Sequence, residues 1–391
     1  MNKQFWNLWT SYALTYFGKI NLSIIIPVLL VTYKDLSLYN VGLVSSGFML
    51  VYAIGQFLHG QISERFNPYV YISVGMIFSG IVTFVLGFTA GFFLFLLILE
   101  CIDGFFQSMP WSSIVRANVH LWKTKEEREK SATVMGCSYQ FGTSITWLIS
   151  AFAVGTWGWE YGFYVSGVII IGRGVLLYFT KPKTEFKPQQ NVKKQVKKTI
   201  SFPIIFSGLG LMFLNMVRYG VLTWIPLYFF ISGDPIIKVG LKIFLIPIAG
   251  IIGTLLYLKY PWKKDYTSIA SLALMGVTWF LFPYTEGITV IILLLAGSFF
   301  LYGPHVFLVT TIPSRFIDDH VVACSTGFID GMGYIGTVSI GLIVPYLVLE
   351  TKGAWSNVFL FWAVLSFVAA GIVAITYFGH FRNNKYVQLK E

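Results

Sequence analysis

The sequence has few charged side chains. Asp, Glu, Lys and Arg make up 12% of its 391 residues, and hydrophobic residues make up 56%. Soluble globular proteins average about 25% charged residues. Acidic residues are the scarcest of the charged class, with 17 against 28 Lys and Arg. So much apolar surface excludes a single water-soluble core, and it predicts an integral membrane protein with the lipid bilayer as its solvent.

Cysteine is also scarce. Cys101, Cys137 and Cys324 all lie inside apolar runs and show no paired spacing. They indicate neither a disulfide framework nor a metal site. The sequence contains no zinc-ligand set, no nucleophilic triad and no phosphate-binding glycine-rich loop. We therefore expect no enzyme activity, no cofactor and no bound metal.

The net charge of +11 does not indicate a nucleic-acid partner, because the basic residues cluster in loops between apolar runs. Runs of about 20 apolar residues are long enough to cross a bilayer as helices. They predict an all-α membrane protein with twelve spans, near 9–33, 41–63, 69–90, 92–116, 131–154, 158–180, 204–232, 236–258, 267–284, 287–311, 322–349 and 355–381.

The longest polar segment, 181–203, lies close to the middle of the chain and carries seven lysines and three prolines. We interpret it as a basic cytoplasmic linker. It divides the chain into a six-helix bundle at 1–180 and a second at 204–391, which includes a short cytoplasmic tail.

An even number of spans puts both termini on one side of the membrane. That side carries 21 of the Lys and Arg residues, and the opposite side carries four. This bias predicts that both termini are cytoplasmic in a multi-pass inner or plasma membrane protein. The first apolar run has no small-residue cleavage site before it ends, so we expect a permanent helix.

The two halves resemble repeats of each other. Lys19 precedes Pro27 by eight residues in the first span, and Arg218 precedes Pro226 by eight in the seventh. A second pattern repeats as well, with Ala132, Gly136 and Gly142 in the fifth span matched by Ala323, Gly327 and Gly333 in the eleventh. Repeated halves around a binding site at the membrane midplane are a known plan of transporters.

Lys19 and Arg218 are the main candidate site residues. A charge at the centre of a span costs roughly 2.5–3.5 kcal/mol on insertion scales, so such residues usually face a cavity or a partner. Two cations at equivalent places in two halves predict a clamp for an anion. Phosphate suits such a clamp, because guanidinium binds it bidentately and ammonium supplies a point charge.

The alternative is that each cation neutralises a buried carboxylate. The possible partners are Glu100, Asp103 and Asp330, and these acids are also possible proton relays. Arg173, the third cation within a span, is expected to have a structural role.

Other polar residues occur at similar depth in the predicted spans. Each one alone is typical of an interhelical contact, and as a set they are candidates to bind a polyhydroxyl substrate. They are Asn21, Tyr52, Gln56, Gln107, Tyr139, Gln140, Tyr302 and His305. Separately, Gly60, Glu64 and Arg65 close the second span at a tight cytoplasmic turn, where we expect a gate rather than a simple solvated turn.

These features resemble the organophosphate:phosphate antiporters of the major facilitator superfamily. The resemblance covers nearly the whole chain and is strongest at 16–21 with Pro27, 60–68, 107–111 with Arg116, 217–224 with Pro226, and 327–336. It implies a major facilitator fold and an alternating-access carrier whose basic pair binds phosphate between the halves.

Arg218 matches the arginine of that family in the seventh span, and Lys19 stands where the family usually has arginine. Gln56 stands where some members have lysine, and Tyr139 replaces a histidine of the glycerol-phosphate carriers. These departures keep both cations but reduce the positive charge around them.

We expect a monomeric carrier that exchanges a small phosphate-bearing anion for inorganic phosphate. One alternative is a proton-coupled symporter of an organic anion or sugar that uses Asp103 or Asp330. Another is a membrane sensor that keeps the carrier fold but signals to a partner.

Overall fold

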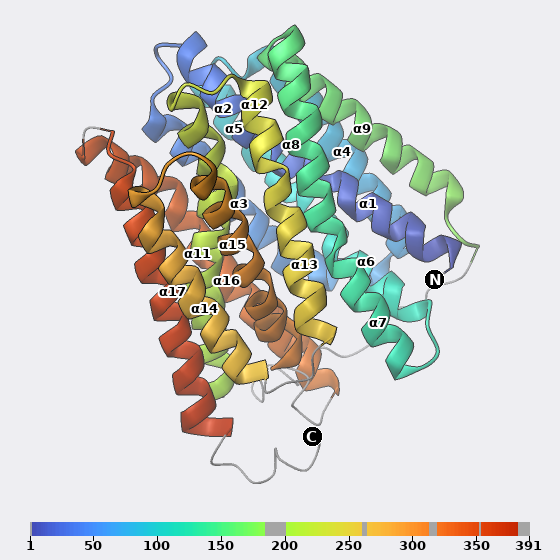
Figure 1. Cartoon of the computed structure of the whole chain (residues 1–391). Coiled ribbons are helices and arrows are strands. Elements are labelled where there is room, and N and C mark those ends of the chain that lie inside the picture. Colours follow the sequence, from blue (N-terminus) through green and yellow to red (C-terminus); the bar gives the residue numbers. More distant parts are fainter. Residues whose placement is uncertain (1, 184–200, 260–263, 313–318, 352, 382–391) are drawn as a thin grey trace. The chain divides into compact units, whose positions relative to one another are not determined.

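A computed structural model describes residues 2–183, 201–259, 264–312, 319–351 and 353–381 (Figure 1). Every regular element in these ranges is helical. In the first half the helices are α1 (Lys3–Lys19), α2 (Asn21–Thr32), α3 (Leu38–Ile62), α4 (Pro68–Thr89), α5 (Phe93–Gln107), α6 (Met109–His120), α7 (Lys125–Gly136), α8 (Ser138–Trp157) and α9 (Trp159–Thr180). The later helices are α11 (Phe202–Ile231), α12 (Ile236–Ile243), α13 (Leu245–Lys259), α14 (Lys264–Leu281), α15 (Ile288–Val306), α16 (Asp319–Glu350) and α17 (Ser356–Thr376).

Within the described residues, eleven helices are long and apolar enough to cross a membrane. They match eleven of the twelve predicted spans. The remaining span, predicted at 131–154, corresponds largely to α8. That helix has 20 residues, but six of them are Ser or Thr, which lowers its apolarity. The predicted all-α membrane fold is confirmed. Of the predicted linker, residues 184–200 lie outside the described residues.

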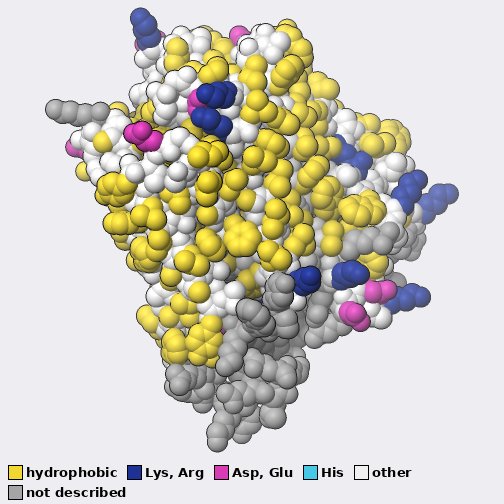
Figure 2. All heavy atoms as spheres, in the orientation of Figure 1, with side chains coloured by type: hydrophobic (Ala, Val, Ile, Leu, Met, Phe, Trp, Pro, Cys, Tyr) yellow, Lys and Arg dark blue, Asp and Glu magenta, His cyan; other side chains and the backbone are white. Residues whose placement is uncertain are grey.

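Hydrophobic side chains cover much of the described surface seen in Figure 2. Phe57, Phe179 and Ile288 are each more than 70% exposed. Exposed apolar area of this extent is rare on a soluble monomer and suits contact with lipid tails. The inner faces of the helices hold the polar groups instead, because a polar side chain facing lipid finds no hydrogen-bond partner.

Four of the predicted spans contain a break between two helices. The breaks lie at Ile20, Ser108, Cys137 and Phe244. Proline explains two of them, because its ring clashes with the carbonyl group four residues earlier. Pro110 follows the break at Ser108, and Pro247 follows the break at Phe244.

The chain forms two compact units, Met1–Gln190 with Leu222–Ile248 and Asn191–Val221 with Ala249–Glu391. The first unit thus includes α12, a helix of the predicted second half. The contact between α12 and α8 explains this grouping. A Cβ placed on Gly240 would stand 2.3 Å from the Ala151 Cβ, so a small residue on α12 lets the two helices pack closely.

Each unit contains an equivalent close approach of two helices. In the first unit, Gly142 of α8 packs against the backbone of Ala13 in α1, with 2.1 Å between a Cβ on the glycine and the Ala13 carbonyl oxygen. In the second unit, Gly333 of α16 packs against Leu211 and Asn215 of α11. The fifth span therefore contacts the first at a glycine, and the eleventh contacts the seventh at the glycine that the repeat pairs with it, although the first contact is with backbone and the second with side chains. This supports the repeat that the sequence predicts.

Candidate functional site

Lys19 lies at the break between α1 and α2. It is the last residue of α1, and Ile20 leaves the helical conformation with φ −121° and ψ −16°. Polar side chains bond locally here, since the Leu22 N–H donates to Asn21 Oδ1 at 2.8 Å and Ser23 Oγ donates to the Ile20 carbonyl at 2.7 Å. Such bonds compete with helix continuation. The C-terminal end of α1 favours the positive charge of Lys19.

Tyrosine rings surround the Lys19 ammonium group. Its Nζ lies 3.7 Å from the centre of the Tyr52 ring and 5.6 Å from that of Tyr16. The Gln56 amide donates to the Tyr52 hydroxyl at 2.7 Å, and Tyr139 stacks on Tyr16 with ring centres 5.9 Å apart. Three of the predicted substrate-binding residues, Tyr52, Gln56 and Tyr139, are therefore gathered around Lys19 in the first unit.

A partly open cavity begins beside Lys19. Its polar lining comes from Lys19, Ser23, Ser45, Glu100 and Thr223, and its apolar lining from Ile20, Leu22, Ile26, Phe48 and Met49. The sequence analysis missed the three hydroxyl residues. Of the three, only Ser23 could have been predicted from the sequence. It lies four residues after Lys19 along the first span, and residues four apart share a helix face.

The acids of α5 lie close to this region. Glu100 is 3% exposed and lines the cavity, whereas Asp103 is fully buried against Ser79 and Thr83 of α4. In the described structure neither acid forms an ion pair with Lys19. The neutralising role predicted for Glu100 and Asp103 therefore has no contact to support it here. Asp330 is half-buried in α16, and its predicted role stays a prediction.

Gln107 connects three helices. Its amide nitrogen donates to the Thr15 carbonyl of α1 at 3.0 Å and to Ser79 Oγ of α4 at 2.7 Å. This places Gln107 as a brace between α5 and its neighbours. Asn21 and Gln140 are almost fully buried, and Asn21 bonds to the start of α2 as described above. Contact of these three residues with substrate stays a prediction.

Arg218 has different surroundings, in the second unit. It lies within the unbroken helix α11, and its Nη1 is 3.0 Å from His305 Nε2 of α15. Arginine only donates hydrogen bonds, so His305 must accept through Nε2, which requires a neutral imidazole. The rings of Tyr219 and Tyr302 have their centres 5.1 and 5.4 Å from the guanidinium carbon. His305 and the two tyrosines therefore fix the orientation of Arg218.

Arg173 holds α9 against α1. Its guanidinium donates to Ser11 Oγ at 3.1 Å and to the carbonyl and side-chain oxygens of Asn7. These neutral acceptors on one neighbouring helix agree with the structural role expected for this cation.

The predicted gate lies at the end of α3, where Gly60 precedes the short turn Ser63–Arg65. The Arg65 side chain is exposed, and the Glu64 side chain lies outside the described residues. Arg116 of α6 holds this turn in place. Its Nη1 donates to the Ser63 carbonyl at 2.6 Å and to the Phe66 carbonyl at 3.2 Å. Arg116 is thus a structural contributor that the gate hypothesis did not include.

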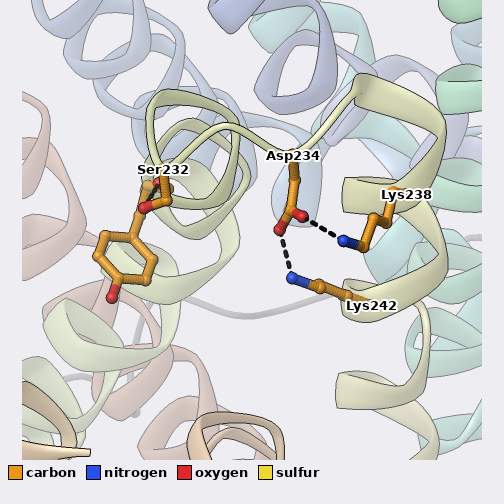
Figure 3. A network of polar contacts seen from close by, with 5 residues as sticks. Ser232, Asp234, Lys238 and Lys242 are labelled. Carbon is orange, nitrogen blue, oxygen red and sulfur yellow. Dashed lines mark hydrogen bonds and ion pairs between the residues drawn. The ribbon is translucent and has the colours of Figure 1, made fainter. Parts of the chain in front are cut away.

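A cluster of charges joins α11 to α12 (Figure 3). Asp234 pairs with Lys238, at 2.9 Å, and with Lys242. Partial burial acts to raise the pKa of Asp234, but hydrogen bonds and positive charge from Lys242 and Lys238 outweigh it and lower that pKa below its usual value. This cluster fixes the turn at Gly233, whose φ of 97° favours glycine.

The model of the family described as Major Facilitator Superfamily matches residues 8–339, most of the chain. The chain belongs to the major facilitator superfamily. The resemblance of the sequence to this superfamily is therefore confirmed. Among solved structures, the chain is similar to a bacterial homologue of the human lysosomal transporter Spinster in an inward-facing, unoccupied conformation, with a TM-score of 0.74, 13% identity and coverage of 99% and 98% of the two chains.

Three curated relatives of this superfamily member cover most of its length. The "Probable hexose phosphate transport protein" of Chlamydia trachomatis is 23% identical over 96% of this chain and 89% of its own. The mouse (Mus musculus) "Glucose-6-phosphate exchanger SLC37A2" is 28% identical, with 84% and 76% covered. The "Membrane sensor protein UhpC" of Escherichia coli is 23% identical, with 94% and 89% covered. None of these names describes an enzyme.

Proposed function

We propose that this major facilitator superfamily protein carries a small phosphorylated organic anion across a cell membrane in exchange for inorganic phosphate. Lys19 and Arg218 bind the anion, and the carrier alternates between openings to the two sides. The membrane is an inner or plasma membrane, with both termini in the cytoplasm and one chain as the working unit. The 21-to-4 distribution of basic residues supports this orientation.

The placement of Lys19 carries this proposal. A buried ammonium group beside a polar cavity, at a break in a membrane helix, is costly unless it serves a ligand. The rings of Tyr52 and Tyr16 lie near this ammonium group and stabilise its positive charge, which attracts an anion. Arg218 supplies a second cation whose planar donors suit phosphate oxygens.

The relatives support the same class of substrate. Two of them are named for hexose phosphate transport and for glucose-6-phosphate exchange. Binding the anion must favour reorientation, because a ligand shifts a two-state equilibrium only through its different affinity for the two states.

Counterflow in vesicles tests the proposal. Purified protein in liposomes loaded with phosphate should take up labelled glucose 6-phosphate, and liposomes without internal phosphate should not. An imposed pH gradient should leave the initial rate unchanged. Failure of internal phosphate to stimulate uptake would contradict exchange.

Two other functions have specific support and distinct outcomes in this assay. Asp103, a fully buried acid on α5, favours a proton-coupled symporter, which a pH gradient would drive without internal phosphate. The similarity to UhpC favours a sensor, which would bind the ester without transporting it.

A further inference from the structure

Glu100 is a buried acid with unused acceptor capacity. It is 3% exposed and lines the cavity next to Lys19. Within the described part of the chain, no side chain donates a hydrogen bond to its carboxylate and no cation pairs with it. A carboxylate has two oxygens that accept about four hydrogen bonds. Glu100 lines the cavity, so a ligand there can supply donors to its carboxylate.

The other polar groups of the cavity define what that ligand looks like. Ser23, Ser45 and Thr223 contribute hydroxyls, which both donate and accept, while Lys19 is the cation of the lining. A ligand that satisfies all of them carries an anionic group for Lys19 and hydroxyl donors for Glu100. A second carboxylate on the ligand would have no hydrogen to donate to Glu100.

We infer that Glu100 determines specificity by accepting hydrogen bonds from hydroxyl groups of the substrate. The cavity then favours phosphate esters of polyhydroxyl compounds, and it rejects phosphate esters that carry a carboxylate. This inference rests on the proposed function, because it assumes that a phosphate ester binds at Lys19.

The role differs from that of the neighbouring acid. Asp103 lies three residues further along α5, is fully buried and is not part of the cavity lining. Its carboxylate lies against Ser79 and Thr83 of α4. The two acids therefore form a matched pair for an experiment, since they share a helix but only one faces the cavity.

The test compares the affinities of two probes, glucose 6-phosphate and 3-phosphoglycerate, by calorimetry on the full chain in nanodiscs. The wild type should prefer glucose 6-phosphate. In Glu100→Gln this preference should fall about tenfold or more, as expected for the loss of a charged hydrogen bond. Asp103→Asn should retain the wild-type preference.

Glu100→Asp is a third variant. It keeps the carboxylate, but its side chain is shorter by one methylene, so the acceptor oxygens lie farther from the ligand. It should still reject 3-phosphoglycerate while binding glucose 6-phosphate more weakly. It also keeps the inference testable if the glutamine variant fails to fold.

A Glu100→Gln protein with the wild-type preference would overturn the inference and leave the proposed function intact. Loss of pH-driven uptake with an unchanged preference would make Glu100 a proton carrier, and it would contradict both the inference and phosphate exchange. A wild type that binds neither ester would overturn the proposed function itself, and the inference with it.

Discussion

Lys19 and Arg218 occupy matching positions in the two halves of the sequence, but the structure surrounds them differently. Lys19 ends a broken helix, lies 3.7 Å from the centre of one tyrosine ring and borders a cavity. Arg218 lies in an unbroken helix and is held by a direct 3.0 Å contact with a histidine. Both side chains are buried.

The difference follows from the chemistry of the two cations. Ammonium is a compact point charge that a ring face stabilises from many directions, so the rings near Lys19 do not impose one direction on its hydrogen bonds. Guanidinium is planar and directional, so a neighbour that orients it prepares it for bidentate bonding. We interpret the two surroundings as one adaptable cation and one oriented cation.

Removing either cation should have the largest effect. Lys19→Ala and Arg218→Ala should each abolish measurable binding of glucose 6-phosphate, because each loses at least one charged hydrogen bond worth roughly 1.5–3 kcal/mol. Calorimetry on the folded variants measures this loss. Arg173→Ala is the matched control, because that cation bonds to Asn7 and Ser11 and should affect stability rather than affinity. Wild-type affinity in either variant would contradict the role of that cation.

Replacing each cation with the other type should show which position needs an oriented cation and which accepts either. Lys19→Arg should retain binding within a few-fold, whereas Arg218→Lys should lose about tenfold, because lysine offers no planar pair of donors. Titration of both variants with the same ester measures the contrast. Equal losses would mean that the two surroundings make no difference to the anion.

Changes to the neighbours should have smaller effects. His305→Leu removes the group that orients Arg218, and Tyr52→Leu removes the ring under Lys19. Each should weaken binding by about 0.5–2 kcal/mol. Tyr52→Phe keeps the ring and loses only the hydroxyl that accepts from Gln56, so it should stay near wild type. An equal effect of Phe and Leu at Tyr52 would mean that the hydroxyl, and not the ring, supports Lys19.

The smallest effect is expected at Asp103. Because it forms no ion pair with Lys19 in the described structure, Asp103→Asn should change the rate of phosphate exchange by less than about twofold, within the spread of neutral substitutions. Vesicle counterflow measures that rate. Retained exchange together with lost pH-driven uptake would instead assign a proton-coupling role to this acid.

The sequence predicts much of the fold because apolar length is a strong signal in a membrane protein. Eleven spans lie within a few residues of the predicted positions. Gly142 and Gly333, which the repeat pairs in sequence, both make close helix contacts. The apolarity criterion alone would miss α8, in which most of the serines and threonines are buried rather than exposed to lipid.

The site was only partly predictable. A charge within a span indicates burial near a ligand or partner, and both cations are indeed buried. Periodicity places Glu100 and Asp103 on one helix face, but it does not show that only Glu100 reaches a cavity. Likewise, the polarity of Gln107 does not reveal that its amide bonds to Thr15 and Ser79. Such differences depend on the packing of neighbouring helices.

The break at Ile20 also has a consequence for the synthesis of the protein. The helix after it, α2, has 12 residues and rises about 18 Å, too short for a hydrocarbon core of about 30 Å. The translocon must therefore release both half-helices as one segment, with the charge of Lys19 inside it. Membrane insertion of this first segment is thus expected to be inefficient until later helices emerge from the ribosome. The first segment would then be held in the membrane by the contacts of α1 and α2 with the fourth, fifth and sixth spans, rather than by its own apolarity.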